Sequence, residues 1–382
     1  MLGRSMTRPA WAGYFVYGLI VLGISFYAML RPAYWWDVLP YTGLALEGDG
    51  LDSGEIHQQA YALVKQHAPP GHWDGMVSGS TYHDTVAADP ESFAETRGFY
   101  RNRVLYIGAI KLLGAAGVPY PVGSYLLSVI SFILVAALML YWLTQIAGVV
   151  WGPPMALLIL LGSGLQEGVR LSNPDLMAGV MLMAAVYQIT EGRQPHRAWI
   201  WFWLAILTRP DSIIMVGLMV GTLHLLKSRG FIARRTVIAG LGLFAITYIT
   251  VMSLTHSYGW WTFYAQKFVA QLAYPASQPI PFDMQQFLRI DIQGWIAIMY
   301  RDYRLFLLIL LTTFVVRSRW GDLLENNRSE VAIIIALALT VPIRLALYPL
   351  FLNRMYMIPI AMLLIMCVKI APLNLKSRAA NL

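Results

Sequence analysis

The sequence predicts an all-α polytopic membrane protein, and three observations lead to this fold class. The 382 residues are 58% hydrophobic and only 13% charged, whereas roughly a quarter of the residues of a soluble domain are charged. The apolar runs are near twenty residues long without alternation, which favours spanning helices. The basic residues behind the net charge of +8 fall in short loops between these runs, which is typical of cytoplasmic loops rather than of nucleic-acid binding.

We expect about ten spanning segments, each an apolar run bounded by polar residues. They cover residues 11–30, 121–143, 153–168, 174–190, 198–208, 211–226, 232–254, 302–316, 331–350 and 354–370. The stretch 198–226 is interrupted by the sequence Thr-Arg-Pro-Asp at 208–211. A straight spanning helix does not hold such a sequence at mid-bilayer, so this stretch predicts two short helices that meet at one surface.

The charges predict how the chain is oriented. With the N-terminus inside, the basic loops 191–197, 227–235 and 317–330 all fall on the cytoplasmic side, as does the C-terminus. We therefore expect a multi-pass membrane protein with both termini cytoplasmic. Two long loops, 31–120 and 255–301, then lie on the periplasmic side.

The first outer loop, residues 31–120, is the more polar of the two. It holds ten of the twenty acidic residues and four of the seven histidines. Its last part, residues 103–117, has apolar residues at helical spacing together with Arg103 and Lys111. This segment is too short to span the bilayer, so we expect an amphipathic helix on the outer surface.

Asp37 is the first candidate for a functional residue. It follows the first apolar run by a few residues and lies among Tyr34, Trp35, Trp36 and Tyr41. A carboxylate at the membrane surface can take the proton of an attacking hydroxyl group. If a helix follows, Tyr41 shares a helix face with Asp37. The alternative is that Asp37 only caps a helix or is solvated in the loop.

Asp175, Arg209 and Asp211 are further candidates. Asp175 lies at the outer mouth of a predicted span, after Asn173 and Pro174, where an aspartate can also serve a helix start as a cap or by favouring its dipole. Arg209 and Asp211 occupy the break between two short helices. Capping can explain Asp211, but it does not explain an arginine at that depth, which indicates a functional role.

Arg344 and Arg354 lie near the outer ends of the last two predicted spans. A guanidinium group presents a planar fork that suits bidentate contacts with phosphate. Arginines that converge on one outer pocket would therefore suit a lipid-linked phosphate. The alternative for Arg354 is anchoring at the membrane interface. Metal binding is possible at four histidines and two aspartates, although solvated loop positions are the simpler interpretation; these are His57, His67, His72, His83, Asp74 and Asp84.

Four segments together carry a resemblance to a known family. They read WWDVLPY at 35–41, RNRVLYIGAIKLLGAAGVPYP at 101–121, LTRPDSII at 207–214 and NRMYMIP at 353–359. In order and membrane side they resemble the GT-C superfamily of integral-membrane glycosyltransferases. This superfamily includes protein O-mannosyltransferases, the aminoarabinose transferase of lipid A and arabinofuranosyltransferases.

The resemblance implies a fold and a division of the chain. Residues 1–254, including loop 31–120, would form the conserved GT-C transmembrane module. Residues 255–382 would supply the second periplasmic loop and variable C-terminal transmembrane helices. The family uses the first outer loop as a catalytic platform over a cavity.

The resemblance also implies a reaction. Such enzymes move a sugar from a polyprenyl-phosphate donor to a periplasmic glycan, lipid or protein acceptor, with inversion at the anomeric carbon. Asp37 matches the catalytic aspartate, whereas many members have two adjacent acidic residues at this place. Arg209 and Arg354 match positions where family members have phosphate-binding basic residues. Arg344, from its own position near the outer end of a span, is expected to bind the donor phosphate with them. The residues expected to line the substrate cavity are Tyr41, Trp36, Asp175, Asp211 and Tyr356.

Two matters stay open at this point. No nucleotide-binding or serine-hydrolase motif is present, so no cofactor is expected, although a divalent metal remains possible. A transporter or flippase of a lipid-linked sugar would also need an outer aromatic loop and intramembrane arginines. A glycan polymerase or ligase is a third alternative.

Overall fold

The fold is built from helices throughout the part of the chain that the structure describes. The computed structural model describes residues 8–192, 194–301, 309–310, 312–313, 317, 320–350 and 352–371. Within these residues strand-type pairing is limited to one isolated parallel bridge between Ala33 and Leu171. Five described helices are long and apolar enough to cross a membrane: α1 (Arg8–Leu30), α8 (Tyr120–Gly162), α13 (Arg234–Leu254), α18 (Arg328–Leu347) and α19 (Asn353–Ile370). The predicted all-α membrane class is thus confirmed.

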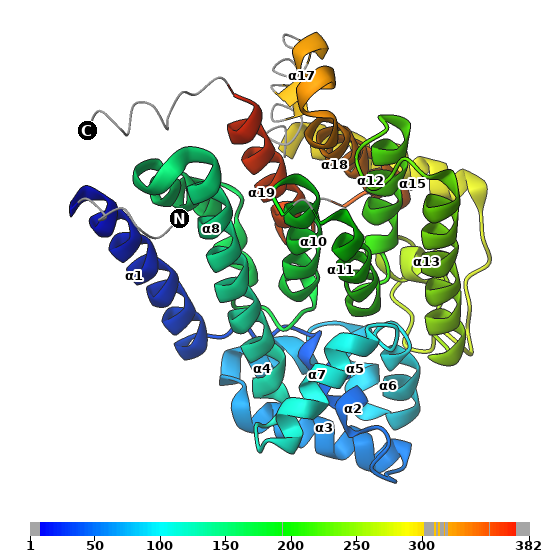
Figure 1. Cartoon of the computed structure of the whole chain (residues 1–382). Helices are drawn as coiled ribbons and strands as arrows, with labels where there is room; N and C mark the ends of the chain where they lie inside the picture. Colours follow the sequence, from blue (N-terminus) through cyan, green and yellow to red (C-terminus); the bar gives the residue numbers. More distant parts are fainter. Residues whose placement is uncertain are drawn as a thin grey trace.

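Three shorter helices pack between the long ones in Figure 1. They are α10 (Asp175–Thr190), α11 (Pro195–Thr208) and α12 (Ser212–Leu225). The predicted break in the stretch 198–226 is present, because Arg209 has extended backbone angles between α11 and α12. The buried apolar side chains of these helices and of α8, α18 and α19 form one continuous core.

The long element α8 consists of two helices that meet at Gly148. This residue has φ 86° and ψ 173°, a backbone conformation that glycine adopts without strain. The chain reverses here, and the two arms come very close: a Cβ atom at Gly152 would lie only 2.7 Å from the Cα atom of Thr144. The returning helix ends at Gly162 and is followed by the short α9 (Leu165–Gly168). The predicted spans 121–143 and 153–168 are therefore the two arms of one tight reversal.

Six short helices form a layer across one end of the bundle, drawn at the bottom of Figure 1. We call this layer the cap: α2 (Val38–Leu46), α3 (Ser53–His67), α4 (Pro70–Val77), α5 (Thr81–Ala88), α6 (Pro90–Arg97) and α7 (Val104–Ala115). Polar side chains cap the starts of α3, α5 and α6, which fixes where these helices begin. Asp52 and Glu55, for example, form a reciprocal capping box at the start of α3. The helix predicted for residues 103–117 is α7 and belongs to the cap.

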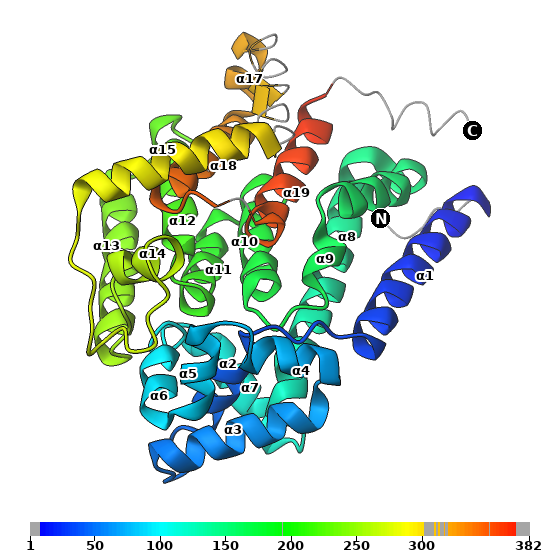
Figure 2. The ribbon, with the colours of Figure 1, turned by 180° about the vertical axis from the view of Figure 1, so that it is seen from behind.

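The second predicted outer loop, residues 255–301, contains two helices, which the sequence analysis did not anticipate. They are α14 (Trp260–Phe268) and α15 (Met284–Arg301), and α15 lies across the back of the bundle in Figure 2. The loop also packs on the cap, because the ring of Tyr258 lies 4.7 Å from the ring of Phe99. One further short helix, α17 (Trp320–Asn326), precedes α18.

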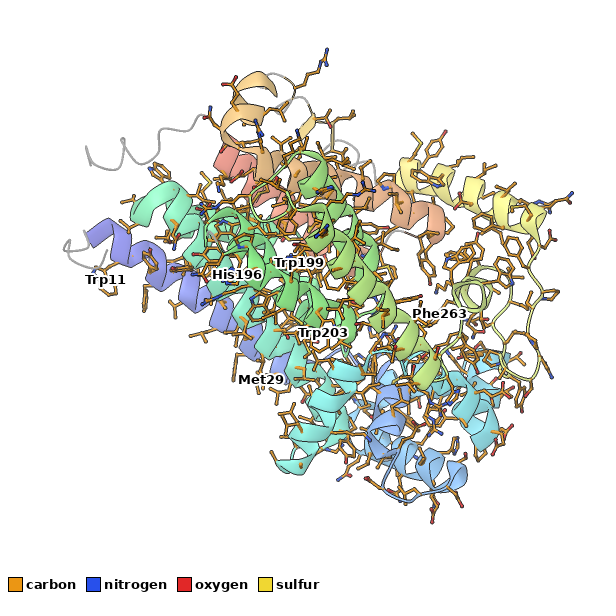
Figure 3. The ribbon with its side chains drawn as sticks, turned by 45° about the vertical axis from the view of Figure 1, so that its right-hand side comes forward. Trp11, Met29, His196, Trp199, Trp203 and Phe263 are labelled. Atoms are coloured by element: carbon orange, nitrogen blue, oxygen red, sulfur yellow. The ribbon has the colours of Figure 1, made fainter. Side chains whose placement is uncertain are left out.

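The outer faces of the long helices are apolar. Trp11 and Met29, labelled near opposite ends of α1 in Figure 3, are 62% and 50% exposed. Phe15 and Phe26 on the same helix are exposed as well. A continuous apolar surface of this size is unfavourable in water and suits contact with lipid. The predicted span 302–316 lies mostly outside the described residues, as do the terminal residues 1–7 and 372–382.

Candidate functional site

The ends of six helices bring charged side chains together beneath the cap. Asp37 immediately precedes α2, and Asp175 is the first residue of α10. Arg209 and Asp211 lie in the link between α11 and α12. Two more arginines complete the group, Arg344 in the last turn of α18 and Arg354 in the first turn of α19. We call these six residues, together with Arg103, the charge cluster.

One half of the charge cluster links the cap to the bundle. The Nη1 atom of Arg354 donates to Oδ2 of Asp37 at 3.0 Å. Nε of the same arginine lies 3.9 Å from Oδ2 of Asp175. The other carboxylate oxygen of Asp175 pairs with Arg209. A residue of the cap is thereby connected through two arginines to the middle of the bundle.

The other half of the charge cluster continues the alternation of charges. Nε of Arg209 donates to Oδ1 of Asp211 at 2.7 Å, and Oδ2 of Asp211 pairs with Arg344. Arg344 also donates from Nη1 to the carbonyl oxygen of Met355 at 3.3 Å. Each carboxylate therefore faces guanidinium groups from different elements, so neutralising one group affects several helices at once.

The alternative that the aspartates are simple helix caps can now be judged from geometry. Asp37 and Asp211 both stand at N-cap positions, yet neither side chain makes a capping hydrogen bond. At α10 the capping contact comes from Asn173, whose Oδ1 accepts from the backbone N–H of Asp175 at 3.1 Å. All three carboxylates are instead used for arginine contacts. Local capping therefore does not account for them.

The charge cluster is mostly buried but opens toward one side. The side chain of Asp175 is 7% exposed and that of Arg209 is 14% exposed. Asp37 and Arg354 are 22% and 23% exposed, and Asp211 is 40% exposed. Removing one member of a buried ion pair leaves an uncompensated charge, which typically costs about 3–5 kcal/mol. A buried group of charges therefore indicates either a function for the charges or complete pairing among them.

Two residues at this site were missed by the sequence analysis as site residues. The hydroxyl group of Tyr100 donates to Oδ1 of Asp37 at 2.8 Å. The guanidinium of Arg103 lies 4.9 Å from the ring centre of Tyr100 and 5.6 Å from that of Tyr41. Their signal is the segment just before α7, where two arginines and a tyrosine precede an apolar helix.

Arg103 differs from the other arginines of the charge cluster in its partners. Its only hydrogen bond within the described residues goes from Nη1 to the carbonyl oxygen of Phe99 at 3.4 Å, and no described carboxylate pairs with it. The described cluster therefore has four guanidinium groups and three carboxylates. One positive charge is left in a half-buried position, where it attracts an anion.

The surroundings of Asp37 keep its carboxyl group ionised. Burial acts to raise its pKa, but the positive charges of Arg354 and Arg103 and the hydrogen bond from Tyr100 outweigh burial. The net result is a pKa below the ordinary value of 3.8. Asp37 is thus an anion at neutral pH and can accept a proton.

The three aromatic residues predicted to line the cavity have different environments. Tyr41 is 1% exposed and packs edge to face against Tyr100 and Tyr106, so it supports Tyr100 from behind. The ring of Trp36 stacks on His83 within the cap at 4.8 Å between ring centres. Tyr356 is buried in an apolar cluster at the α18–α19 junction.

The histidines of the cap are engaged in packing and backbone contacts. His57 lies between the rings of Tyr61 and Phe93, and Nδ1 of His72 accepts from the backbone N–H of Tyr34 at 3.3 Å. The described residues hold no group of three or more His, Cys, Asp or Glu side chains that could bind a metal ion. The carboxylates of the charge cluster already face arginines, so this donor set does not fit a divalent cation.

A cleft of about 610 Å³ adjoins the charge cluster. It is lined by Gly23 and Tyr27 of α1 and by Trp35, Glu167 and Arg170. Oε2 of Glu167 accepts from Nδ2 of Asn353 at 3.0 Å, directly before Arg354. Asn353 thus links the wall of the cleft to the start of α19.

Comparisons with family models, curated proteins and solved structures return no match for this chain.

Proposed function

We propose that this chain is an inverting glycosyltransferase with a GT-C-like arrangement of about ten spanning helices. It would transfer a sugar from a polyprenyl-phosphate donor on the periplasmic face of a bacterial inner membrane. The observation that carries the proposal is the position of Asp37. Its ionised carboxylate contacts Tyr100 and Arg354 and lies beside the unpaired guanidinium of Arg103.

The proposed reaction is a single displacement. A hydroxyl oxygen of the acceptor forms a bond to the anomeric carbon of the donor sugar, and the bond from that carbon to the phosphate oxygen breaks. Asp37 takes the proton of the hydroxyl group, and the electron pair leaves with the prenyl phosphate. Attack from the face opposite the leaving group inverts the anomeric centre. The arginines stabilise the negative charge that develops on the phosphate.

The roles of the other residues follow from their contacts. Arg103 has unused guanidinium donors and would receive the donor phosphate. Arg354 holds Asp37 in place and lies close enough to share the phosphate charge. Arg209 and Arg344 position Asp211 and Asp175 behind them. The cleft along α1 offers an apolar wall for the prenyl chain.

The place of the charge cluster within the helices favours an enzyme over a transporter or flippase. Substrate sites of secondary transporters lie near the bilayer midplane, in helices that are broken there. Here Asp175 begins α10, Arg209 ends α11 and Arg354 begins α19. Groups at helix ends suit chemistry at the membrane surface, where a glycan, lipid or protein acceptor can approach.

The test is the conservative variant Asp37→Asn in purified full-length protein. We expect transfer to fall by about 10²–10⁴-fold, the range typical of losing a general base. Binding of polyprenyl phosphate should stay within about threefold of wild type, because the arginines are unchanged. The products from a panel of polyprenyl-phosphate sugars are identified by mass spectrometry. Asp49→Asn is the matched control, since Asp49 is exposed in the cap.

Three outcomes would reject the proposal. Full transfer by Asp37→Asn would remove the proposed base. Movement of a lipid-linked sugar across vesicles without covalent product would identify a transporter. Joining of whole oligosaccharides instead of single sugars would identify a polymerase or ligase.

A further inference from the structure

A second pocket lies at the opposite end of the helix bundle, which we call the far end. It measures about 290 Å³ and lies where three helix links approach each other. Its wall includes Thr190 at the end of α10, Lys227, Ser228 and Arg229 after α12, and Arg328 and Ser329 at the start of α18. The helix α10 has 16 residues, which places the far end about 24 Å from Asp175 along the helix axis.

The wall of this pocket is held in place from behind. Phe231 is fully buried and packs on Trp199, the residue labelled on α11 in Figure 3, with ring centres 5.4 Å apart. Its carbonyl oxygen also lies 2.8 Å from Nδ1 of His224. At Gly230, with φ +84°, a Cβ atom would lie 2.3 Å from Pro195. The link after α12 is therefore packed tightly and does not need to reorganise to bind a ligand.

Two polar features of the pocket lack partners. The N-cap residue of α18, Asn327, makes no side-chain capping hydrogen bond, so the first backbone N–H groups of this helix receive no acceptor from it. Ser228 is 2% exposed, and its hydroxyl oxygen has no hydrogen-bond partner in the described structure. A buried hydroxyl group without a partner is unfavourable, and an anion in the pocket would accept its hydrogen bond.

The charges around the pocket favour an anion. Lys227, Arg229 and Arg328 line it, and none of them pairs with a described carboxylate. Of the two acidic residues in the wall, Glu330 is already paired with Lys369 at 2.5 Å. The other, Glu325, is exposed. Basic pockets between spanning helices on the cytoplasmic side bind anionic lipid headgroups.

The backbone of Lys227 is a further observation. This lysine has φ +53°, the left-handed conformation that suits glycine and is unfavourable for a lysine. Glycine at this position would relieve the strain. A lysine here therefore lowers the stability of the folded backbone locally.

We propose that the far-end pocket binds the phosphate of an anionic phospholipid headgroup. The pocket volume fits a headgroup rather than a whole lipid, and the apolar faces of the surrounding helices leave the acyl chains in the bilayer. Lys227, Arg328 and the start of α18 contact the phosphate, and the Ser228 hydroxyl group donates to it.

The test compares two glycine substitutions at the described non-glycine residues with positive φ. Lys227→Gly removes the charge and relieves the backbone. His256→Gly makes the same backbone change at φ +47° in the 255–301 loop and is the matched control. Arg328→Gln is a second charge variant. Native mass spectrometry measures retention of phosphatidylglycerol by full-length protein in detergent, and phosphatidylcholine is the zwitterionic reference.

We expect wild type and His256→Gly to retain one phosphatidylglycerol in preference to phosphatidylcholine. Lys227→Gly and Arg328→Gln should each weaken that binding by about fivefold, the effect of one basic residue near a lipid phosphate. Because the glycine variant relieves strain, its thermal unfolding midpoint should not fall, so weaker binding cannot be attributed to misfolding. Equal retention by wild type and Lys227→Gly, or equal retention of the two lipids, overturns the proposal. Displacement of phosphatidylglycerol by low millimolar inorganic phosphate would identify a site for a soluble anion instead.

Discussion

The two ends of the helix bundle both bury charges, but they arrange them differently. At the far end one ammonium group, that of Lys369, contacts Glu191 at 2.7 Å and Glu330 at 2.5 Å. It also donates to the carbonyl oxygen of Thr190 at 3.2 Å. Beneath the cap, Arg209, Arg344 and Arg354 share three carboxylates, and no described carboxylate pairs with Arg103. Lys369 is surrounded by acceptors, whereas Arg103 has one long contact to a carbonyl oxygen.

This difference separates a structural ion pair from a candidate site. An ammonium group has three donors, and Lys369 has three acceptor oxygens around its own, two of them on carboxylates. These contacts fasten α19 to the end of α10 and to the start of α18. A guanidinium group has five donors, and most of those of Arg103 have no partner within the described residues. Burial of charge is therefore a weaker indication of function than burial of charge with unused donors.

The largest expected effect tests the structural role of the far-end ion pair. Lys369→Met leaves Glu191 and Glu330 without their shared cation, so the free energy of unfolding should fall by about 3–5 kcal/mol. Transfer per folded molecule should not change. Chemical unfolding in detergent and the transfer assay measure the two quantities, and Lys267→Met, at an exposed lysine, is the control. A loss of transfer at unchanged stability would break the comparison.

The second effect tests the unused donors of Arg103. Arg103→Gln should weaken binding of polyprenyl phosphate by about 10–100-fold, because hydrogen bonds to charged groups contribute about 1.5–3 kcal/mol. Stability should change little, since no described carboxylate loses a partner. Isothermal titration with polyprenyl phosphate measures the affinity. Arg101→Gln is the matched control, because Arg101 pairs with Glu47 at 2.8 Å in the cap; equal weakening by both variants would argue against a specific role for Arg103.

The third effect concerns pH. Burial acts to raise the pKa of Asp211, but the charges of Arg209 and Arg344 outweigh it and lower the pKa from 3.8 to about 2. A lowered pKa means that the stabilisation is complete above pH 3.8 and is lost as the pH falls toward 2. Since the side chain of Asp211 is 40% exposed, we expect its ion pairs to contribute only about 1 kcal/mol to the free energy of unfolding. The measurement is the free energy of unfolding of wild type and of Asp211→Asn across this pH range, and the gap between the two should close as the pH falls. A gap that widens at lower pH would contradict the assigned ion pairs.

The smallest effect tests the cleft beside the charge cluster. A Cβ atom at Gly23 or at Gly18 would meet no atom within 4 Å, so each position has open space beside the helix for a side chain to begin. Only Gly23 lines the cleft. Gly23→Leu should therefore weaken binding of polyprenyl phosphate by about fourfold, the cost of exposing one buried methylene group at about 0.8 kcal/mol. Gly18→Leu should bind as wild type does; equal behaviour of the two variants would place the prenyl chain elsewhere.

Much of the fold could be predicted from the sequence, because spanning helices reveal themselves by length and apolar composition alone. The break at Arg209 was predictable since proline and charges interrupt a helix at any depth. The helix α15 was missed because polar residues such as Arg289 and Asp291 divide its apolar residues. The tightness of the reversal at Gly148 depends on its φ angle, which the sequence does not display.

The candidate site was predictable in part. Six of the seven charged residues of the cluster could be named because charges are costly near lipid and therefore conspicuous. Which of them meet could not be read from the chain, since an aspartate at a helix start can equally cap its own helix or pair with a distant arginine. Asp37 and Arg354, which hydrogen-bond to each other, are separated by 317 positions. Tyr100 was missed because a tyrosine in a polar loop carries no signal until its hydroxyl group is placed.

The unmatched arginine beneath the cap has a consequence for turnover in the proposed reaction. A sugar-linked prenyl phosphate carries one negative charge, which a single surplus guanidinium neutralises. The spent carrier is a phosphate monoester with a charge of about −1.5 to −2 at neutral pH, so the same arginines would hold it more strongly than the incoming donor. Departure of the used lipid, rather than formation of the glycosidic bond, would then set the pace of the cycle, and added carrier would slow the enzyme.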